Sequence, residues 1–176
     1  MRQHFTALAA TLILAPASAM AQDAATPAPA AQNERVSMTR AIEAAQAQFD
    51  GGVLEAEIET EDGRLIYEID MVRGSDVYEL AVDAQTGDVL SQSEERLTSF
   101  LSGLFQEDEL RAAGDSGDIL MKALADLEAT GVTQIEELSL DEEDGRMVYE
   151  IELTDASGER EILIDAATGE TVVDAD

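Results

Sequence analysis

Residues 63–90 read GRLIYEIDMVRGSDVYELAVDAQTGDVL, and residues 145–172 read GRMVYEIELTDASGEREILIDAATGETV. The two stretches align without a gap at an offset of 82 residues (145 minus 63). The same offset brings the apolar positions of an upstream helical segment onto one another. Chance does not hold one register through a helix and several strands, so we interpret the chain as a duplicated unit.

Each unit begins with a helical pattern. Apolar residues recur at helical spacing over residues 37–49 and again over 117–129. Ser37 and Ser116 stand at the predicted N-cap positions, and glycines follow the predicted ends of both helices.

Alternating apolar and polar residues then predict a meander of strands in each unit. Asp62-Gly63 and Asp144-Gly145 are typical of two-residue hairpin turns. A short fourth strand is expected after each Thr-Gly turn, at Val89-Leu90 and at 171–173. The predicted fold class is α+β, with two tandem repeats that each pack one helix on a four-stranded antiparallel sheet.

Between the units, residues 94–113 carry another amphipathic pattern. We interpret 93–115 as an amphipathic connecting helix that joins the two repeats and packs across both sheets. The alternative is a hydrophobic docking surface for a partner protein. The residues of this candidate partner surface are Phe100, Leu101, Leu104 and Phe105.

The chain starts with a pattern typical of an export signal. A short positive start precedes an apolar stretch too short to span a membrane, and small residues follow it. We expect cleavage after Ala21, with Ala19 as the alternative, and therefore a periplasmic or secreted protein without a membrane span. The predicted organisation is signal peptide 1–21, disordered Ala/Pro linker 22–34, first repeat 35–92, connecting helix 93–115 and second repeat 116–176.

Composition excludes several functions. The formal net charge of -29 at pH 7 argues against nucleic acid as a partner, because such binding depends on Lys and Arg that neutralise phosphates. The chain has no Cys, and its one histidine, His4, lies in the predicted signal. Thiolate chemistry and imidazole catalysis are therefore excluded for the mature protein. No cofactor and no metal site is expected.

The many acidic residues allow more than one interpretation. Residues 59–63 and 141–145 are acidic runs, but neither has the ligand spacing of a calcium-binding loop, and both are expected to be hairpin turns. Ca²⁺ therefore remains a partner without a supporting motif. Acidic residues also alternate with apolar ones along the strands, which predicts an acidic sheet face that is either simply solvated or attracts a basic partner. The residues of this face are Glu55, Glu57, Glu59, Glu68, Asp70, Glu150 and Glu152.

The repeated turn resembles that of the PepSY domain family. The resemblance is carried by Tyr67-Glu68-Ile69 with the stretch 82–90, and by Tyr149-Glu150-Ile151 with the stretch 164–170. We interpret the turn residues as structural, with Asp side chains that accept backbone N–H groups. These turn residues are Asp83, Thr86, Gly87, Asp165, Thr168 and Gly169.

The resemblance also implies a function. PepSY domains occur in propeptides of thermolysin-like metallopeptidases and as separate exported bacterial proteins. It implies a non-catalytic exported binding module that regulates or inhibits a peptidase or another envelope protein in trans. The alternative is an acidic, Ca²⁺-binding or salt-adapted periplasmic protein. An enzyme is not expected, because the acids lie on turns and solvent faces rather than as a facing pair.

Overall fold

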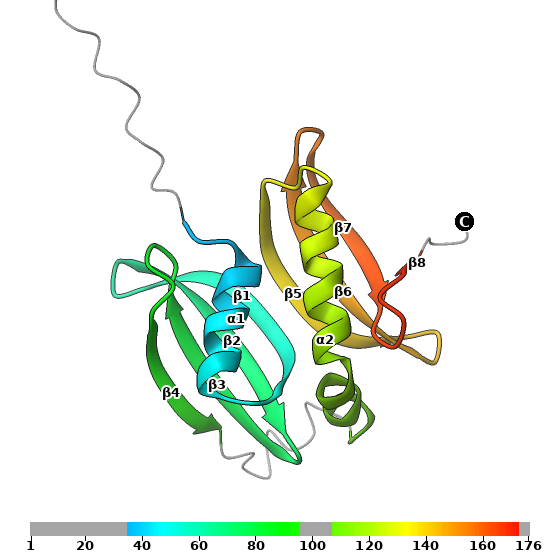
Figure 1. The fold of residues 1–176 in the computed structure, drawn as a ribbon, viewed down its shortest axis with the longest axis horizontal. Coiled ribbons are helices and arrows are strands. Elements are labelled where there is room, and N and C mark those ends of the chain that lie inside the picture. The colour runs from blue at the N-terminus through cyan, green and yellow to red at the C-terminus, as the bar shows by residue number, and fades with distance from the viewer. Residues whose placement is uncertain (1–34, 96–106, 173–176) are drawn as a thin grey trace, which may run out of the picture. The chain divides into compact units, whose positions relative to one another are not determined.

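The computed structural model describes residues 35–95 and 107–172 (Figure 1). They form two helices and eight strands, in the order α1, β1–β4, α2, β5–β8. The helices are α1 (Met38–Gln48) and α2 (Glu107–Ala129). The strands are β1 (Gly52–Glu61), β2 (Arg64–Arg73), β3 (Asp76–Asp83), β4 (Val89–Glu95), β5 (Gln134–Glu143), β6 (Arg146–Asp155), β7 (Gly158–Asp165) and β8 (Thr171–Val172).

All eight strands belong to one antiparallel sheet, with the order β4-β3-β2-β1-β5-β6-β7-β8. The mixed α+β class and the antiparallel pairing agree with the sequence prediction. The expectation of a separate four-stranded sheet in each repeat is wrong, because β1 pairs with β5 and joins the two halves. Pairing these two strands removes two open sheet edges, which are otherwise prone to unwanted association.

The joint between the halves is nearly symmetric. Ala56 of β1 pairs with Leu138 of β5, and these two residues are equivalent at the 82-residue offset (138 minus 56). The flanking pairs are Glu55 with Ser139 and Glu57 with Glu137. A pair of equivalent residues on antiparallel strands marks a local two-fold axis. Equivalent strands of the two repeats therefore lie at equal distances on either side of the joint.

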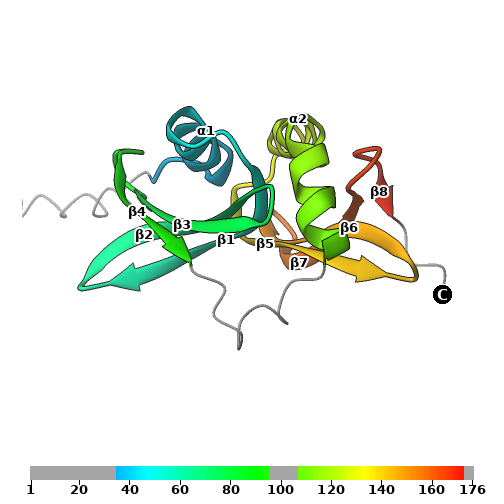
Figure 2. The same ribbon diagram turned by 90° about the horizontal axis from the view of Figure 1, so that it is seen from below.

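Both helices lie on the same face of the sheet (Figure 2). Ser37 caps α1 as predicted, and its Oγ accepts a hydrogen bond from the Arg40 N–H at 3.3 Å. The apolar stripe of α1 is buried, together with the apolar faces of the strands below it. The helix face of the sheet therefore holds the main core, whereas the other face carries the acidic side chains together with buried apolar residues such as Ile66 and Val148.

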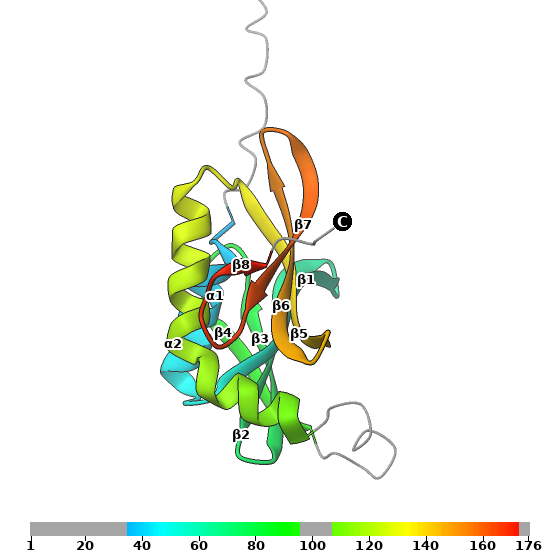
Figure 3. The same ribbon diagram turned by 90° about the vertical axis from the view of Figure 1, so that its right-hand side faces the viewer.

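Helix α2 differs from the prediction. The sequence indicated a connecting helix over 93–115 and a separate helix capped by Ser116, whereas one helix runs from Glu107 through Ser116 to Ala129. Ser116 is buried inside this helix, so it is not an N-cap. The helix changes direction along its length (Figure 3). Gly114, Ser116 and Gly117 lie close together in it, and Gly/Ser combinations are frequent causes of helix bends.

Gly52 sets how closely α2 approaches the first half of the sheet. A Cβ atom on Gly52 would lie 2.0 Å from the carbonyl oxygen of Ala113. The backbones of β1 and α2 therefore touch at a point where a side chain cannot fit. The sequence suggested Gly51 and Gly52 as the stop of the first helix and did not indicate this contact.

The local turns follow the sequence. Asp62 and Gly63 both have positive φ, as do Asp144 and Gly145, in agreement with the two hairpin predictions. The fourth strands differ: β4 extends to Glu95, beyond the predicted Val89-Leu90, whereas β8 has two residues.

Candidate interaction surface

The face of the sheet opposite the helices carries a row of five glutamates, here called the glutamate row. Each lies directly opposite the next on a neighbouring strand, across β2, β1, β5, β6 and β7. In spatial order they are Glu68, Glu57, Glu137, Glu152 and Glu161. The row crosses the joint between the halves without interruption.

A second acidic row runs beside the first, two residues further along each strand. It crosses β3, β2, β1, β5 and β6, and Ser139 is its one neutral member. Its members are Glu79, Asp70, Glu55, Ser139 and Glu150. Directly opposed side chains on antiparallel strands have Cβ atoms about 4.5–5.5 Å apart, and like charges at this distance destabilise the pairing.

Proton binding relieves part of this repulsion. The pKa of Glu68 is raised from its ordinary value of 4.5 to about 7. Partial burial is the main cause, followed by a hydrogen bond with Glu59 and the negative charges of Glu79, Glu59 and Asp70. Glu68 therefore binds a proton more readily than an exposed glutamate does.

Three more carboxyl groups near the joint shift in the same direction. Partial burial raises the pKa of Glu55, and Glu57 and Glu137 add to the effect. The pKa of Glu137 is raised by partial burial and by Glu152 and Glu57. The pKa of Glu150 is also raised, mainly by partial burial and then by neighbouring carboxylates, of which Glu161 contributes most. The two rows therefore form one electrostatic system across both halves of the sheet.

Among the described residues, the row does not have the geometry of a metal centre. Within the described residues, no group of three or more Asp, Glu, His or Cys side chains is placed to hold a metal ion. In the same part of the chain, no ion pair involves any of the five row glutamates. What the arrangement can do chemically is bind protons and repel or attract charged groups.

The sequence predicted part of this surface. The alternation indicated that Glu55, Glu57, Glu59, Glu68, Asp70, Glu150 and Glu152 share an acidic face, and the strand register agrees. It did not indicate that Glu137 and Glu161 complete a straight row. A strand irregularity between Ile135 and Glu137 interrupts the period of two in β5, and the pairing of β1 with β5 joins residues far apart in the chain.

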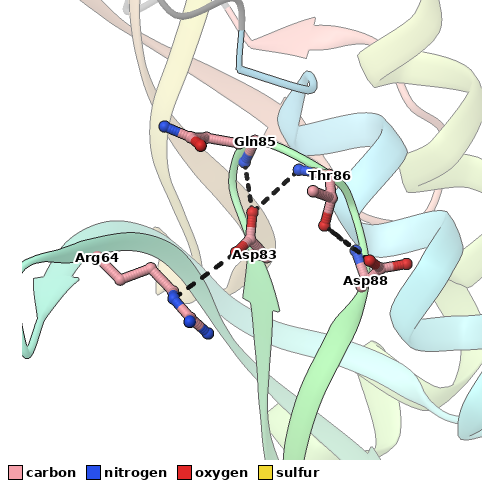
Figure 4. Close-up of polar contacts among 5 residues, drawn as sticks. All are labelled: Arg64, Asp83, Gln85, Thr86 and Asp88. Carbon is pink, nitrogen blue, oxygen red and sulfur yellow. Dashed lines mark hydrogen bonds and ion pairs between the residues drawn. The ribbon is translucent and has the colours of Figure 1, made fainter.

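The predicted turn motif is present in both halves. In the first half, Asp83 Oδ1 accepts hydrogen bonds from the N–H groups of Gln85 at 2.8 Å and Thr86 at 3.0 Å (Figure 4). The Thr86 hydroxyl donates to Asp88 at 2.9 Å, and Arg64 lies 3.8 Å from the Asp83 carboxylate. These backbone bonds are the main cause of a lowered pKa at Asp83.

The second half repeats the arrangement. Asp165 Oδ1 accepts from the N–H groups of Ala167 at 3.0 Å and Thr168 at 2.9 Å. Gly87 and Gly169 both have a φ of 75°, the left-handed region that the turn requires and that suits glycine. These residues are therefore explained by the turn itself and need no ligand.

The two outer edges of the sheet are unequal. The edge strand β4 has seven residues, and the side chains from Leu90 to Glu94 are exposed. The edge strand β8 has two residues. The predicted partner surface of Phe100, Leu101, Leu104 and Phe105 lies outside the described residues.

Fold and surface together define a class of protein: a small antiparallel α+β module, made of two copies of a helix followed by a meander, with one covered sheet face and one open acidic face. The family model for the peptidase propeptide and YPEB domain, PepSY, matches residues 35–93 and 118–172. The chain therefore belongs to the PepSY family, as its repeated turn suggested.

Two solved structures show a low similarity to this chain. One solved structure, a proposed lipoprotein from Clostridium difficile 630, is 23% identical, with 81% of this chain and 94% of that chain covered and a TM-score of 0.43. A second, the YpmB protein from Bacillus subtilis, is 17% identical, with 77% and 94% covered and a TM-score of 0.29. A comparison with curated proteins gives no significant match. Among the described residues, neither helix has the length and apolar character needed to cross a membrane.

Proposed function

We propose that the chain is an exported, non-catalytic PepSY module that binds a peptidase or another envelope protein in trans and regulates it. The family supports a link to peptidases, since its model is named for peptidase propeptides. The export pattern at residues 1–21 supports a periplasmic or secreted location. The acidic groups of the open face are arranged side by side on a solvent-facing sheet, which favours binding over catalysis.

The observation that carries this proposal is the exposed edge of β4. An extended segment of a partner can add to such an edge through backbone hydrogen bonds, a common mode of peptide recognition. Leu90 is 42% exposed, and the register of β3 and β4 shifts beside it. Ser91, Gln92 and Ser93 follow it in regular pairing. Edge strands that avoid association carry charged side chains or Pro along their length, whereas the stretch from Val89 to Ser93 in β4 contains neither.

Charge indicates which segment suits this edge. Glu94 is exposed near the end of β4, and the whole chain has a formal charge of -29. A second copy of the chain would bring the same negative charge to the edge, whereas a basic extended segment would be attracted to it. We therefore propose an extended basic segment of a partner protein as the occupant of the β4 edge.

The proposal can be tested with the purified mature chain. We expect it to retain a peptidase or other envelope protein from the same organism and to change the activity of that protein when added back. Proline substitution in β4 should block the edge. Backbone N–H groups alternate in direction along a strand, so either Ser91→Pro or Gln92→Pro removes an outward N–H while sparing the pairing with β3.

The matched control is Thr171→Pro on the opposite, two-residue edge. The effective β4 variant should lose the partner while keeping the circular dichroism spectrum and melting temperature of the parent chain, and the control should keep the partner. A mature chain that retains no envelope protein and alters no peptidase activity would contradict the proposed function. A partner retained equally by both folded β4 variants would contradict the choice of edge.

A further inference from the structure

The joint between the two halves is short. β1 pairs with β5 through three residue pairs, whereas β1 pairs with β2 and β5 with β6 through nine pairs each. The two halves therefore depend on few backbone hydrogen bonds for their sheet contact. Other interactions at the joint must contribute strongly to whether it stays closed.

On the helix face the contacts beside β1 and β5 are attractive and uncharged. Ala56 and Leu138 are both fully buried there. The Tyr149 hydroxyl donates to the Val53 carbonyl oxygen at 3.0 Å and lies 2.7 Å from the Ser116 Oγ, so one side chain of the second half contacts β1 and α2. None of these groups changes its charge between pH 5 and pH 8. The helices add one contact to a carboxyl group, in which the Thr39 hydroxyl of α1 donates to Glu128 Oε1 of α2 at 2.6 Å.

On the open face the interactions are repulsive. Glu57 faces Glu68 of β2 and Glu137 of β5, and Glu137 in turn faces Glu152 of β6. Glu55, two residues along β1, faces Asp70 of β2 and Ser139 of β5. No directly opposite position at the joint carries a cation, so ionised side chains push the two strands apart.

We infer that the joint is a proton-operated contact: proton uptake by Glu55 and Glu137 beside the joint strengthens the pairing of β1 with β5, and proton release weakens it. The raised pKa values of Glu55 and Glu137 support this direction, because Glu137 contributes to the shift at Glu55 and Glu57 contributes to the shift at Glu137, each across the joint. A closed joint holds protons that an open joint releases, so opening becomes easier as the pH rises above about 4.5. The inference does not depend on which partner the chain binds.

Amide hydrogen exchange of the mature chain at pH 5 and pH 8, corrected for the intrinsic pH dependence of exchange, tests this inference. Amides at 55–57 and 137–139 should be protected about tenfold less at pH 8, the change that corresponds to one pKa unit of differential proton binding. Amides in the centre of β2 and β6 that bond to β3 and β7 should change much less.

The row variant Glu57→Gln with Glu137→Gln removes the two charges that face each other across the joint. It should raise protection at pH 8 to the level seen at pH 5. The matched control Glu61→Gln with Glu143→Gln removes the same net charge at the exposed hairpin ends of β1 and β5 and should leave the pH dependence intact. Glu68→Gln with Glu152→Gln provides a second row variant in case the first is poorly folded.

Equal protection of the joint at both pH values in the parent chain would overturn the inference. So would a control variant that abolishes the pH dependence as fully as the row variant, because net charge rather than the row would then be responsible.

Discussion

Tyr67 and Tyr149 occupy equivalent positions in the two repeats, yet they hold different parts of the molecule together. The Tyr67 hydroxyl donates to the carbonyl oxygen of Val36 at 2.7 Å, within its own repeat. The Tyr149 hydroxyl donates to Val53 of the other repeat and contacts Ser116 of α2. Burial raises the pKa of both tyrosines, that of Tyr149 to about 12. Tyr67 thus stabilises contacts within the first repeat, whereas the equivalent Tyr149 stabilises the contact between the two repeats.

The two repeats also differ where their first strands, β1 and β5, begin. Gly52 begins β1, and the residue equivalent to it at the start of β5 is Gln134. β1 must let the α2 backbone approach, whereas β5 needs no such space. The two copies of the unit therefore differ at a point where one copy meets the other.

The largest expected effect comes from breaking this asymmetry at Gly52. The variant Gly52→Ala places a Cβ atom 2.0 Å from the Ala113 oxygen, so β1 or α2 must move. We expect a loss of about 3 kcal/mol in the free energy of unfolding. The equivalent variant Gln134→Ala should cost about 0.5 kcal/mol or less. Urea unfolding of both variants measures the difference, and equal losses would contradict the contact.

Substitution of the two tyrosines should give the next largest loss of stability. Tyr149→Phe leaves the buried Val53 carbonyl without its donor and should cost about 2 kcal/mol, whereas Tyr67→Phe should cost about 1 kcal/mol. A double-mutant cycle of Tyr149→Phe with Ser116→Ala should show coupling, because the two hydroxyl groups are in contact. Additive losses in that cycle would argue that Tyr149 and Ser116 act independently.

Substitutions at the two turn glycines, Gly87 and Gly169, should differ less from each other in their loss of stability. Both have a φ of 75°, so Gly87→Val and Gly169→Val each force a β-branched residue into a disfavoured region. A Cβ atom on Gly169 would lie 3.1 Å from Ile119, compared with 3.6 Å from Val36 for Gly87. We expect losses of about 1.5 kcal/mol for Gly169→Val and about 1 kcal/mol for Gly87→Val by thermal unfolding. The reverse order would show that the second turn is the more adaptable one.

The smallest effect is the dependence of stability on pH. The raised pKa values of Glu55, Glu68, Glu137 and Glu150 mean that the folded chain binds protons that the unfolded chain has lost between about pH 4.5 and 7. The free energy of unfolding should therefore fall, by about 1 kcal/mol after screening by solvent, as the pH rises through this window.

At more acidic pH the trend should reverse. The pKa values of Asp83 and Asp155 are lowered from 3.8, mainly by backbone hydrogen bonds, so their contribution is present above pH 3.8 and is lost as the pH falls through the lowered values. Denaturant unfolding from pH 3 to pH 8 should therefore show a maximum between about pH 4 and pH 5. A stability that rises steadily up to pH 8 would contradict the account of the row.

What the sequence could predict depended on how local each interaction is. Asp62-Gly63, the Ser37 cap and the Asp83 turn are determined by neighbouring residues, and all three were predicted. Ser116 was assigned wrongly, because a serine ahead of an apolar stripe looks the same whether the helix starts there or passes through.

The joint was not predictable for a different reason. Pairing Ala56 with Leu138 joins strands far apart in the chain, and alternation indicates which face is apolar but not which edge meets which. The straight glutamate row follows from that pairing, so it too was missed. The repeat offset did contain one clue, since a two-fold joint pairs equivalent residues with each other.

The two repeats share one sheet through β1 and β5, and the nuclear Overhauser effect between these strands in the mature chain at pH 5 tests this pairing directly. We expect cross-strand contacts between 55–57 and 137–139 in the register that sets Ala56 opposite Leu138. Their absence, with the contacts within each half intact, would show two separate four-stranded sheets and would contradict the claim.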